Sequence, residues 1–300
     1  TGRPPSSARG RLIWGAPVVP ATQVKALLRA RSDARSDSLC PVGGAGETVV
    51  GRHTMLPPAK TSCIRSTMPF RASAAASTSS SRIALARASA VTDRIILATV
   101  ITLVPERNPL ILAKEIAALD HSSGGRFLFG IGAGWNREET TIMGGDFDHR
   151  WAQTREAVLA MKELWTKDEA EFHGRYYDFP PVYCYPKPVQ KPHPPVLLGG
   201  NAPNVLQRVA RWGDGWLPSR VSPAQVEESR KILDTLAAGR GRDPGSLTIS
   251  VFGQPPETDR DQIEAFLNAG AERVSVWASH CETEAEMGEQ LERMADALIA

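Results

Sequence analysis

The most regular pattern along the chain is an alternation, from residue 92 onward, of short apolar runs with longer segments of helical periodicity. The apolar runs lie at residues 94–101, 126–131, 195–199, 214–217, 247–252 and 273–277. The helical segments run from Pro109 to a glycine stop at Gly124–Gly125, and then over 154–165, 203–212, 223–238, 259–269 and 283–300. Such alternation is typical of βαβ units. It predicts an α/β fold, a (β/α)₈ TIM barrel with eight strands or nearly so.

The first 91 residues lack this pattern, so they are predicted to form an irregular N-terminal segment ahead of a barrel over 92–300. Two further strands would complete the barrel. The sequence offers Leu12–Trp14 with Val18–Val19 as the first, a helix over 21–31, and 37–40 as the second. Residues 43–76 show no periodicity and are predicted to be coil, whereas 72–90 are weakly helical. The segment therefore resembles a degenerate remnant of the first two βα units.

Charge separates the same two regions of the chain. Residues 1–91 carry 13 basic and 3 acidic side chains, and the remainder carries 22 basic and 30 acidic ones. A basic, serine-rich leader is compatible with a targeting segment, a frame-shifted coding region or nucleic-acid binding. Nucleic-acid binding is disfavoured because basic and aromatic residues do not interleave.

Composition narrows the class further. With 42% hydrophobic and 23% charged residues, and no apolar run near the roughly 20 residues that span a bilayer, the chain is expected to be a cytoplasmic protein without membrane contact. The four cysteines are scattered, which predicts neither a disulfide framework nor a metal site. Asp120 and Arg126 flank a helix-to-strand turn and are expected to form an ion pair. The segment 172–195 is too long for a simple connection and should have structure or function of its own.

Three loops that follow predicted strands hold the candidate chemistry, because active sites of parallel barrels lie at the carboxyl ends of the strands. Gly199-Gly200-Asn201 precedes a helix and could cradle a phosphate on free N–H groups, or be a tight turn with Asn201 as the N-cap. Gly132-x-Gly134 is a weaker candidate. His149 and Arg150 lie just before a helix, either as a solvated surface pair or as a phosphate clamp. Residues 94–300 contain no obvious general acid or base.

Eight short motifs, taken in order, resemble one family, the luciferase-like monooxygenase superfamily and specifically its coenzyme F420-dependent (deazaflavin) oxidoreductases. The motifs are Thr92-Asp-Arg-Ile-x-Leu-x-Thr99, Pro105-x-Arg-Asn-Pro-Leu110, Leu119-Asp-x-x-Ser-Gly-Gly-Arg126, Gly130-x-Gly-x-Gly-Trp-x-Arg-Glu-Glu139, Phe172-His-Gly-x-Tyr-Tyr177, Pro186-Lys-Pro-Val-Gln190, Pro194-Pro-x-x-x-Gly-Gly200 and Gly213-Asp-Gly-Trp216. The resemblance covers about residues 92–220 and continues more loosely to the C-terminus.

The resemblance implies a cofactor site at the carboxyl ends of the strands. A non-proline cis peptide bond at Val100–Ile101 would support the ring system, and the glycine-rich loops would hold the phosphate and the tail. The implied cofactor-binding residues are Val100, Ile101, Gly132, Gly134, Glu138, Arg150, Leu198, Gly199, Gly200 and Asn201. Flavin monooxygenases of the family have an Arg-Tyr pair where this chain has Arg150-Trp151, which favours F420 over FMN.

The resemblance also marks a departure. Relatives place a polar ring-contacting residue at the end of the second strand, but Asp37-Ser-Leu39 is followed by no histidine, and Glu47 and Thr48 are the nearest polar residues. No catalytic residue is therefore assigned. The expected function is hydride transfer between F420 and a small organic substrate. An FMN-dependent monooxygenase and a non-catalytic barrel are the alternatives, and a homodimer is left open.

Overall fold

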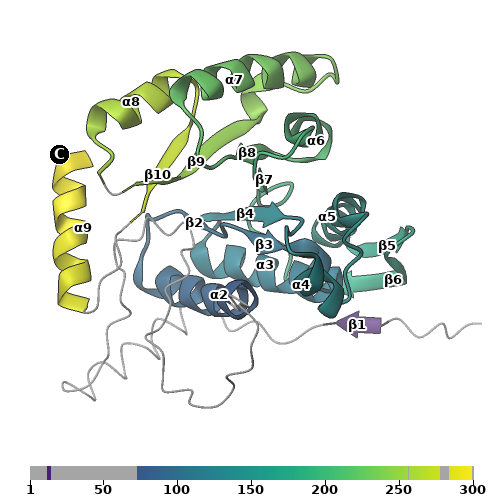
Figure 1. Cartoon of the computed structure of the whole chain (residues 1–300). Helices are drawn as coiled ribbons and strands as arrows, with labels where there is room; N and C mark the ends of the chain where they lie inside the picture. The colour runs from purple at the N-terminus through teal and green to yellow at the C-terminus, as the bar shows by residue number, and fades with distance from the viewer. Residues whose placement is uncertain (1–11, 15–72, 256, 278–283, 299–300) are drawn as a thin grey trace, which may run out of the picture.

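The computed structural model describes residues 12–14, 73–255, 257–277 and 284–298. Its main feature is one curved, all-parallel sheet with the strand order β10-β9-β8-β7-β4-β2, and β3 also pairs with β4 (Figure 1). The strands are β2 (Leu97–Ala98), β3 (Thr102–Leu103), β4 (Phe127–Gly132), β7 (Val196–Gly199), β8 (Gly215–Leu217), β9 (Thr248–Gln254) and β10 (Arg273–Val276). All six predicted strands are present and parallel. Within the described residues the sheet ends at β2 and β10, so closure into eight strands stays a prediction.

Helices follow the strands as predicted and lie on the outer side of the sheet (Figure 1). They are α3 (Pro109–Ser123), α4 (Arg137–Ile142), α5 (Arg150–Thr166), α6 (Val205–Trp212), α7 (Pro223–Ala238), α8 (Arg260–Asn268) and α9 (Glu284–Leu298), with short 3₁₀ turns η1 (Val104–Glu106) and η2 (Pro244–Ser246). The Asn108 side chain caps α3 by accepting from the Leu110 N–H at 2.9 Å, and Gly124 ends it at φ 66°. These are the start and stop signals that the sequence carries.

The N-terminal segment differs from its prediction in two places. Strand β1 (Leu12–Trp14) pairs in parallel with β6, outside the seven-stranded sheet, so its assignment as the first barrel strand is wrong. An exposed strand edge offers unpaired backbone groups to any nearby extended segment, which explains the pairing. Helix α2 (Ser73–Val91) confirms the weakly helical prediction for 72–90, although its first residues fall within 43–76, which was predicted to be coil, and its Leu85 is buried in the main core. The predictions for 18–19, 21–31, 37–40 and 43–72 lie outside the described residues.

The long segment before β7 forms a hairpin of β5 (Glu169–His173) and β6 (Asp178–Cys184), paired antiparallel with Phe172 opposite Phe179. The carboxylate of Glu156 on α5 accepts hydrogen bonds from the backbone N–H groups of Tyr176 and Tyr177 in the hairpin turn. This confirms that the segment has structure of its own.

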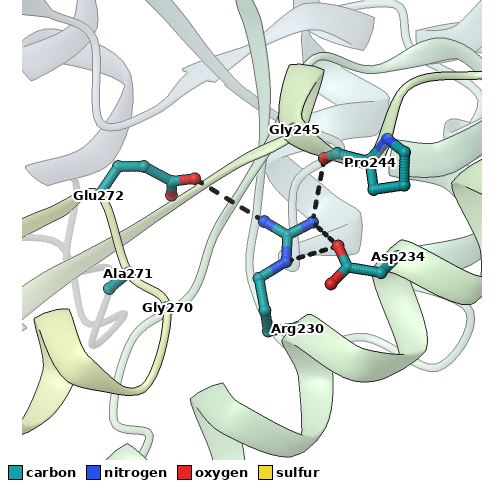
Figure 2. Close-up of a pocket in the computed structure, with 7 residues that line it drawn as sticks. All are labelled: Arg230, Asp234, Pro244, Gly245, Gly270, Ala271 and Glu272. Carbon is teal, nitrogen blue, oxygen red and sulfur yellow. Dashed lines mark hydrogen bonds and ion pairs between the residues drawn. The ribbon is translucent and has the colours of Figure 1, made fainter.

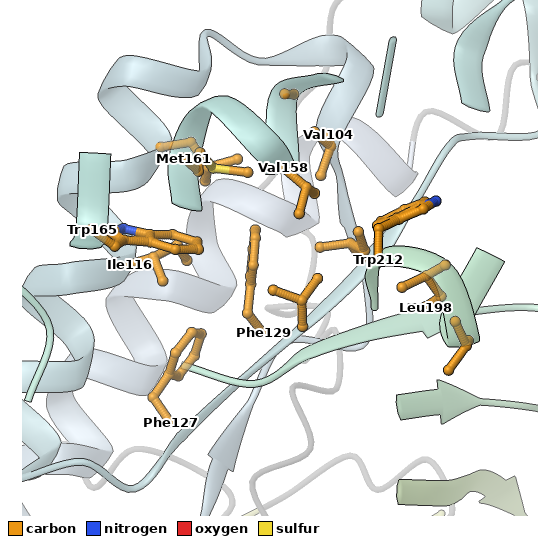
Figure 3. Packing of buried hydrophobic residues seen from close by; sticks show 14 of the residues in the cluster. Val104, Ile116, Phe127, Phe129, Val158, Met161, Trp165, Leu198 and Trp212 are labelled. Carbon is orange, nitrogen blue, oxygen red and sulfur yellow. The ribbon is translucent and has the colours of Figure 1, made fainter. Parts of the chain in front are cut away.

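Two hydrophobic clusters lie on opposite faces of the sheet, which is why its strands read as apolar throughout. Alternate residues of β4 face the helices, where the Phe129 ring meets Trp165 edge-on at 6.1 Å (Figure 3). The residues between them face inward, and we call that side of the sheet the inner face. It is formed by Ala98, Leu128, Leu197 and Leu217, with Val100, Ile101 and Phe252 packed against them.

Candidate active site

The candidate site is built around Ile101, which lies where β2 gives way to β3. The Val100–Ile101 peptide bond is cis, as the family resemblance predicts, and it lies between β2, the regular part of the expected strand 94–101, and β3. A Cβ at position 132 would overlap Cδ1 of Ile101, and a Cβ at position 199 would lie 2.7 Å from its Cγ2. Both glycines are therefore required by the Ile101 side chain. The structure brings together Val100, Ile101, Gly132 and Gly199.

Gly130, which precedes Gly132 in β4, allows a second close approach of two strands. The Thr99 hydroxyl donates to the Gly130 carbonyl at 2.8 Å, and a Cβ at position 130 would overlap the Thr99 carbonyl oxygen. The backbones of β2 and β4 can approach this closely only because position 130 has no side chain.

The predicted phosphate loop is only partly free to bind an anion. The Gly200 N–H donates to the Leu217 carbonyl at 3.1 Å, and the Gly200 carbonyl accepts from Trp216 Nε1 at 2.9 Å. The expectation that this N–H is free is therefore wrong, because the loop is fastened to β8. Gly200 also adopts φ 92°, which supports the tight-turn interpretation. Within the described region of the chain, the N–H groups of Asn201 and Ala202 donate to no acceptor.

Two further residues of this loop differ from expectation. Helix α6 begins at Val205 after Asn204, which has φ 65°, so Asn201 is not the N-cap. The exposed Asn201 side chain instead donates to the Ser219 carbonyl at 2.6 Å. The Leu198 side chain is fully buried in the helix-facing core, so a cofactor on the inner face could not touch it.

Arg150 braces the loop that follows β4. Its Nε donates to the Gly134 carbonyl at 3.1 Å, and its NH1 group donates to the Phe147 carbonyl at 2.8 Å. It is thus not a solvated partner of His149, which pairs with Asp146 at 2.8 Å, and its contact with a cofactor phosphate stays a prediction. Glu138 is exposed in the first turn of α4. Its cofactor contact stays a prediction.

A buried acid in the same region escaped the sequence analysis. Glu106 lies in η1 directly after β3, with a relative exposure of 9%, and Glu139 is buried beside it at 8%. Burial, and then the charge of Glu139, raise the pKa of Glu106 to about 7, although the Thr140 hydroxyl and Arg107 oppose the shift. The available signal was a carboxylate within an apolar run that follows a strand. Residues 94–300 therefore do contain a group that can exchange a proton near neutral pH.

The site is compatible with a flat cofactor that bears a phosphate. The inner face offers an apolar surface at Val100 and Ile101, and the N–H groups of Asn201 and Ala202 lie at its edge without acceptors. Among the described residues, no group of three or more His, Cys, Asp or Glu side chains could hold a metal ion. The described helices include none that is long and apolar enough to cross a bilayer.

Comparison with known sequences identifies relatives of both cofactor types. The family model described as luciferase-like monooxygenase matches residues 65–269. An uncharacterised protein of Mycobacterium tuberculosis is 43% identical over 182 residues, which cover 59% of this chain and 64% of that protein. The FMNH₂-dependent dimethylsulfone monooxygenase of Pseudomonas putida is 30% identical, covering 48% of this chain and 40% of the enzyme. The F420-dependent glucose-6-phosphate dehydrogenase of Amycolatopsis mediterranei is 27% identical, covering 64% and 58%.

Comparison with solved structures supports the same fold. The coenzyme F420-dependent tetrahydromethanopterin reductase of Methanopyrus kandleri matches with a TM-score of 0.62 at 18% identity, covering 73% of this chain and 86% of the reductase. The match to each of the three sequence relatives spans less than two thirds of that relative's own length.

Proposed function

Because the chain belongs to the luciferase-like monooxygenase family, we propose that it is an oxidoreductase that transfers a hydride between coenzyme F420 and a small organic substrate. The observation that carries the proposal is the contact of Ile101, which follows β2, with Gly132 and Gly199 at the carboxyl ends of β4 and β7. Active sites of parallel barrels lie at this edge. Two further strands would complete the eight-stranded barrel, with the cofactor at this edge.

Different residues would bind the ring system, the phosphate and the tail of the cofactor. Val100 and Ile101 would support the ring system from the inner face, and the free N–H groups of Asn201 and Ala202 would donate to the phosphate. Gly134 and Glu138 would lie along the tail, in a loop that Arg150 holds in place. A bound deazaflavin would supply the hydride-carrying carbon. Glu106 is positioned behind this loop to hold or release a proton near pH 7.

FMN is the second candidate, because the Pseudomonas putida relative is named for reduced FMN. The preference for F420 rests on Trp151, which stands where the flavin monooxygenases that this chain resembles have a tyrosine. Its indole has no hydroxyl to offer, and the guanidinium of Arg208 lies over its ring at 4.5 Å.

The decisive experiment is a parallel titration of the purified protein with oxidised F420 and with FMN, following the quenching of cofactor fluorescence. We expect saturable 1:1 binding of F420 and markedly weaker binding of FMN. Binding of FMN alone would replace F420 by the monooxygenase alternative, which oxygen consumption with reduced FMN would then test. Binding of neither cofactor would contradict both and favour a non-catalytic barrel.

A further inference from the structure

A second pocket begins beside the candidate active site, at Trp151, and lies on the outer wall of the molecule between α5, α6 and the end of α7. It has a volume of about 380 Å³. Its principal lining side chains are Trp151, Arg155, Arg208, Arg211, Trp212 and Arg240. We propose that this pocket binds a small polyanion that carries several phosphate or carboxylate groups.

Uncompensated positive charge is the first support for the proposal. Four arginines converge on the pocket, and within the described residues none of them forms an ion pair with an acid. No acidic residue lines it. Arg208 is half-buried, and burial together with the nearby charge of Arg150 lowers its pKa. Positive charges that line one small pocket repel one another, and a bound anion would offset that repulsion.

Another pocket of the same molecule contains an arginine whose charge is balanced by nearby carboxylates. Arg230 lies in a hollow of similar size, about 350 Å³, between α7, η2 and the start of β10 (Figure 2). Its guanidinium contacts Asp234 at 2.6 Å and Glu272 at 3.7 Å, and it donates to the Leu247 carbonyl at 2.6 Å. That arginine has its counter-charges within the protein, whereas the described part of the chain supplies none to the four arginines of the second pocket.

The second support is the type and setting of the side chains. Guanidinium groups donate in a planar fork that matches phosphate and carboxylate oxygens. Arg208 is held in place, because it stacks on Trp151 at 4.5 Å and donates to the Pro203 carbonyl at 2.9 Å. Arg240 is exposed and donates to the Leu236 carbonyl at 3.0 Å, and Arg155 and Arg211 are exposed and free to turn toward a ligand. Two held and two adjustable donors suit a compact ligand with several anionic groups.

The placement of the arginines argues for a small molecule over a nucleic acid. The arginines come from three helical segments around one hollow, rather than forming a stripe along one face, and two indole rings contribute to its wall. A duplex backbone needs positive charge spread along its length.

The test uses the full chain, with inorganic tripolyphosphate and citrate as probes and isothermal titration calorimetry as the readout. We expect 1:1 binding of at least one probe, weakened by rising salt. Arg155→Gln/Arg211→Gln should lose at least tenfold in affinity. The matched control Arg175→Gln/Lys231→Gln removes the same charge from exposed sites outside the pocket and should retain the affinity.

The probes also identify the ligand class, since tripolyphosphate binding alone points to a phosphorylated ligand and citrate binding alone to a polycarboxylate. Four results would overturn the proposal: no saturable binding of either probe, equal losses in the two double variants, displacement of the probe by F420 or FMN, or tighter pocket-dependent binding of duplex DNA. Thermal melts of both variants verify that they fold, which the exposed positions of the substituted side chains lead us to expect.

Discussion

The Ile101 side chain fills the space that a side chain at position 132 would need. We therefore predict that substitutions at these two positions have strongly coupled effects on the free energy of unfolding. Gly132→Ala places a methyl group against Cδ1 of Ile101, and overpacking of this kind typically costs about 1–3 kcal/mol. Ile101→Val removes Cδ1 and so makes room for the methyl group. The double variant should therefore be more stable than the sum of the single changes predicts. Urea denaturation of the four proteins gives the coupling energy, and additive effects would show that the two residues do not compete for space.

The raised pKa of Glu106 predicts that the stability of the protein falls as the pH rises. Its pKa is about 7 in the folded protein, above the ordinary 4.5, so folding favours the protonated acid. The stability that this proton confers is complete below about pH 4.5 and is lost as the pH rises to about 7, by on the order of 3 kcal/mol at most. Glu106→Gln mimics the protonated acid and should remove that loss. The fall in melting temperature between pH 5 and pH 8 should shrink in this variant.

The control for this measurement is Glu138→Gln, which removes an exposed acid from the same region and should leave the pH profile of stability unchanged. An identical profile in the wild type and in Glu106→Gln would contradict the raised pKa. If the proposed function is right, the pH dependence of turnover should also lose a transition near pH 7 in Glu106→Gln.

Among the elements, the turn between β5 and β6 is joined to α5 by the side chain of Glu156. Glu156→Ala would leave the N–H groups of Tyr176 and Tyr177 without their acceptor, at a cost of about 1–3 kcal/mol for each group that stays buried. Glu156→Gln keeps an acceptor oxygen and should cost less. Denaturant unfolding ranks the two variants. Equal losses would mean that the charge, rather than the acceptor, holds the hairpin.

Elements were predicted well where local signals and periodicity agree. Pro109 and the glycine stop at Gly124–Gly125 gave both ends of α3, and the helix predicted over 223–238 has the bounds of α7. The strand predicted over 94–101 ends before Ile101, whose side chain packs against glycines of two other strands. No local sequence pattern records that contact. The raised pKa of Glu106 likewise depends on Glu139, which lies 33 positions away in the sequence.

For the whole molecule, the buried Asp120 joins two of the sequence motifs that lie 70 residues apart. Its carboxylate accepts from the Gln190 backbone N–H at 2.9 Å and from Gln190 Nε2 at 2.6 Å. The expected ion pair with Arg126 is therefore not formed, and Arg126 donates instead to carbonyls such as that of Thr92 at 2.7 Å. Sequence proximity favoured the wrong partner, because it carries no information about which loop returns to this turn.

The corresponding prediction is that Asp120→Ala destabilises the whole domain by about 1–3 kcal/mol or more, since it leaves donors of Gln190 unsatisfied in the interior. Substituting the exposed neighbour His121 by alanine should change the free energy of unfolding much less. Chemical denaturation monitored by tryptophan fluorescence and by circular dichroism should show one coincident transition that shifts in Asp120→Ala. A shift no larger than that of His121→Ala would contradict this role of Asp120.

The glycines of β4 also have a consequence for how such a sequence can drift under mutation. At position 132 a new methyl group would meet only the tip of the flexible Ile101 side chain. A chain that first acquires Ile101→Val could therefore accept alanine at position 132. At position 130 the obstacle is the Thr99 carbonyl of the neighbouring backbone, and no side-chain change elsewhere removes it. In a library under selection for folding, variants at position 132 should therefore appear mainly on backgrounds shortened at position 101. Position 130 should stay invariant on every background.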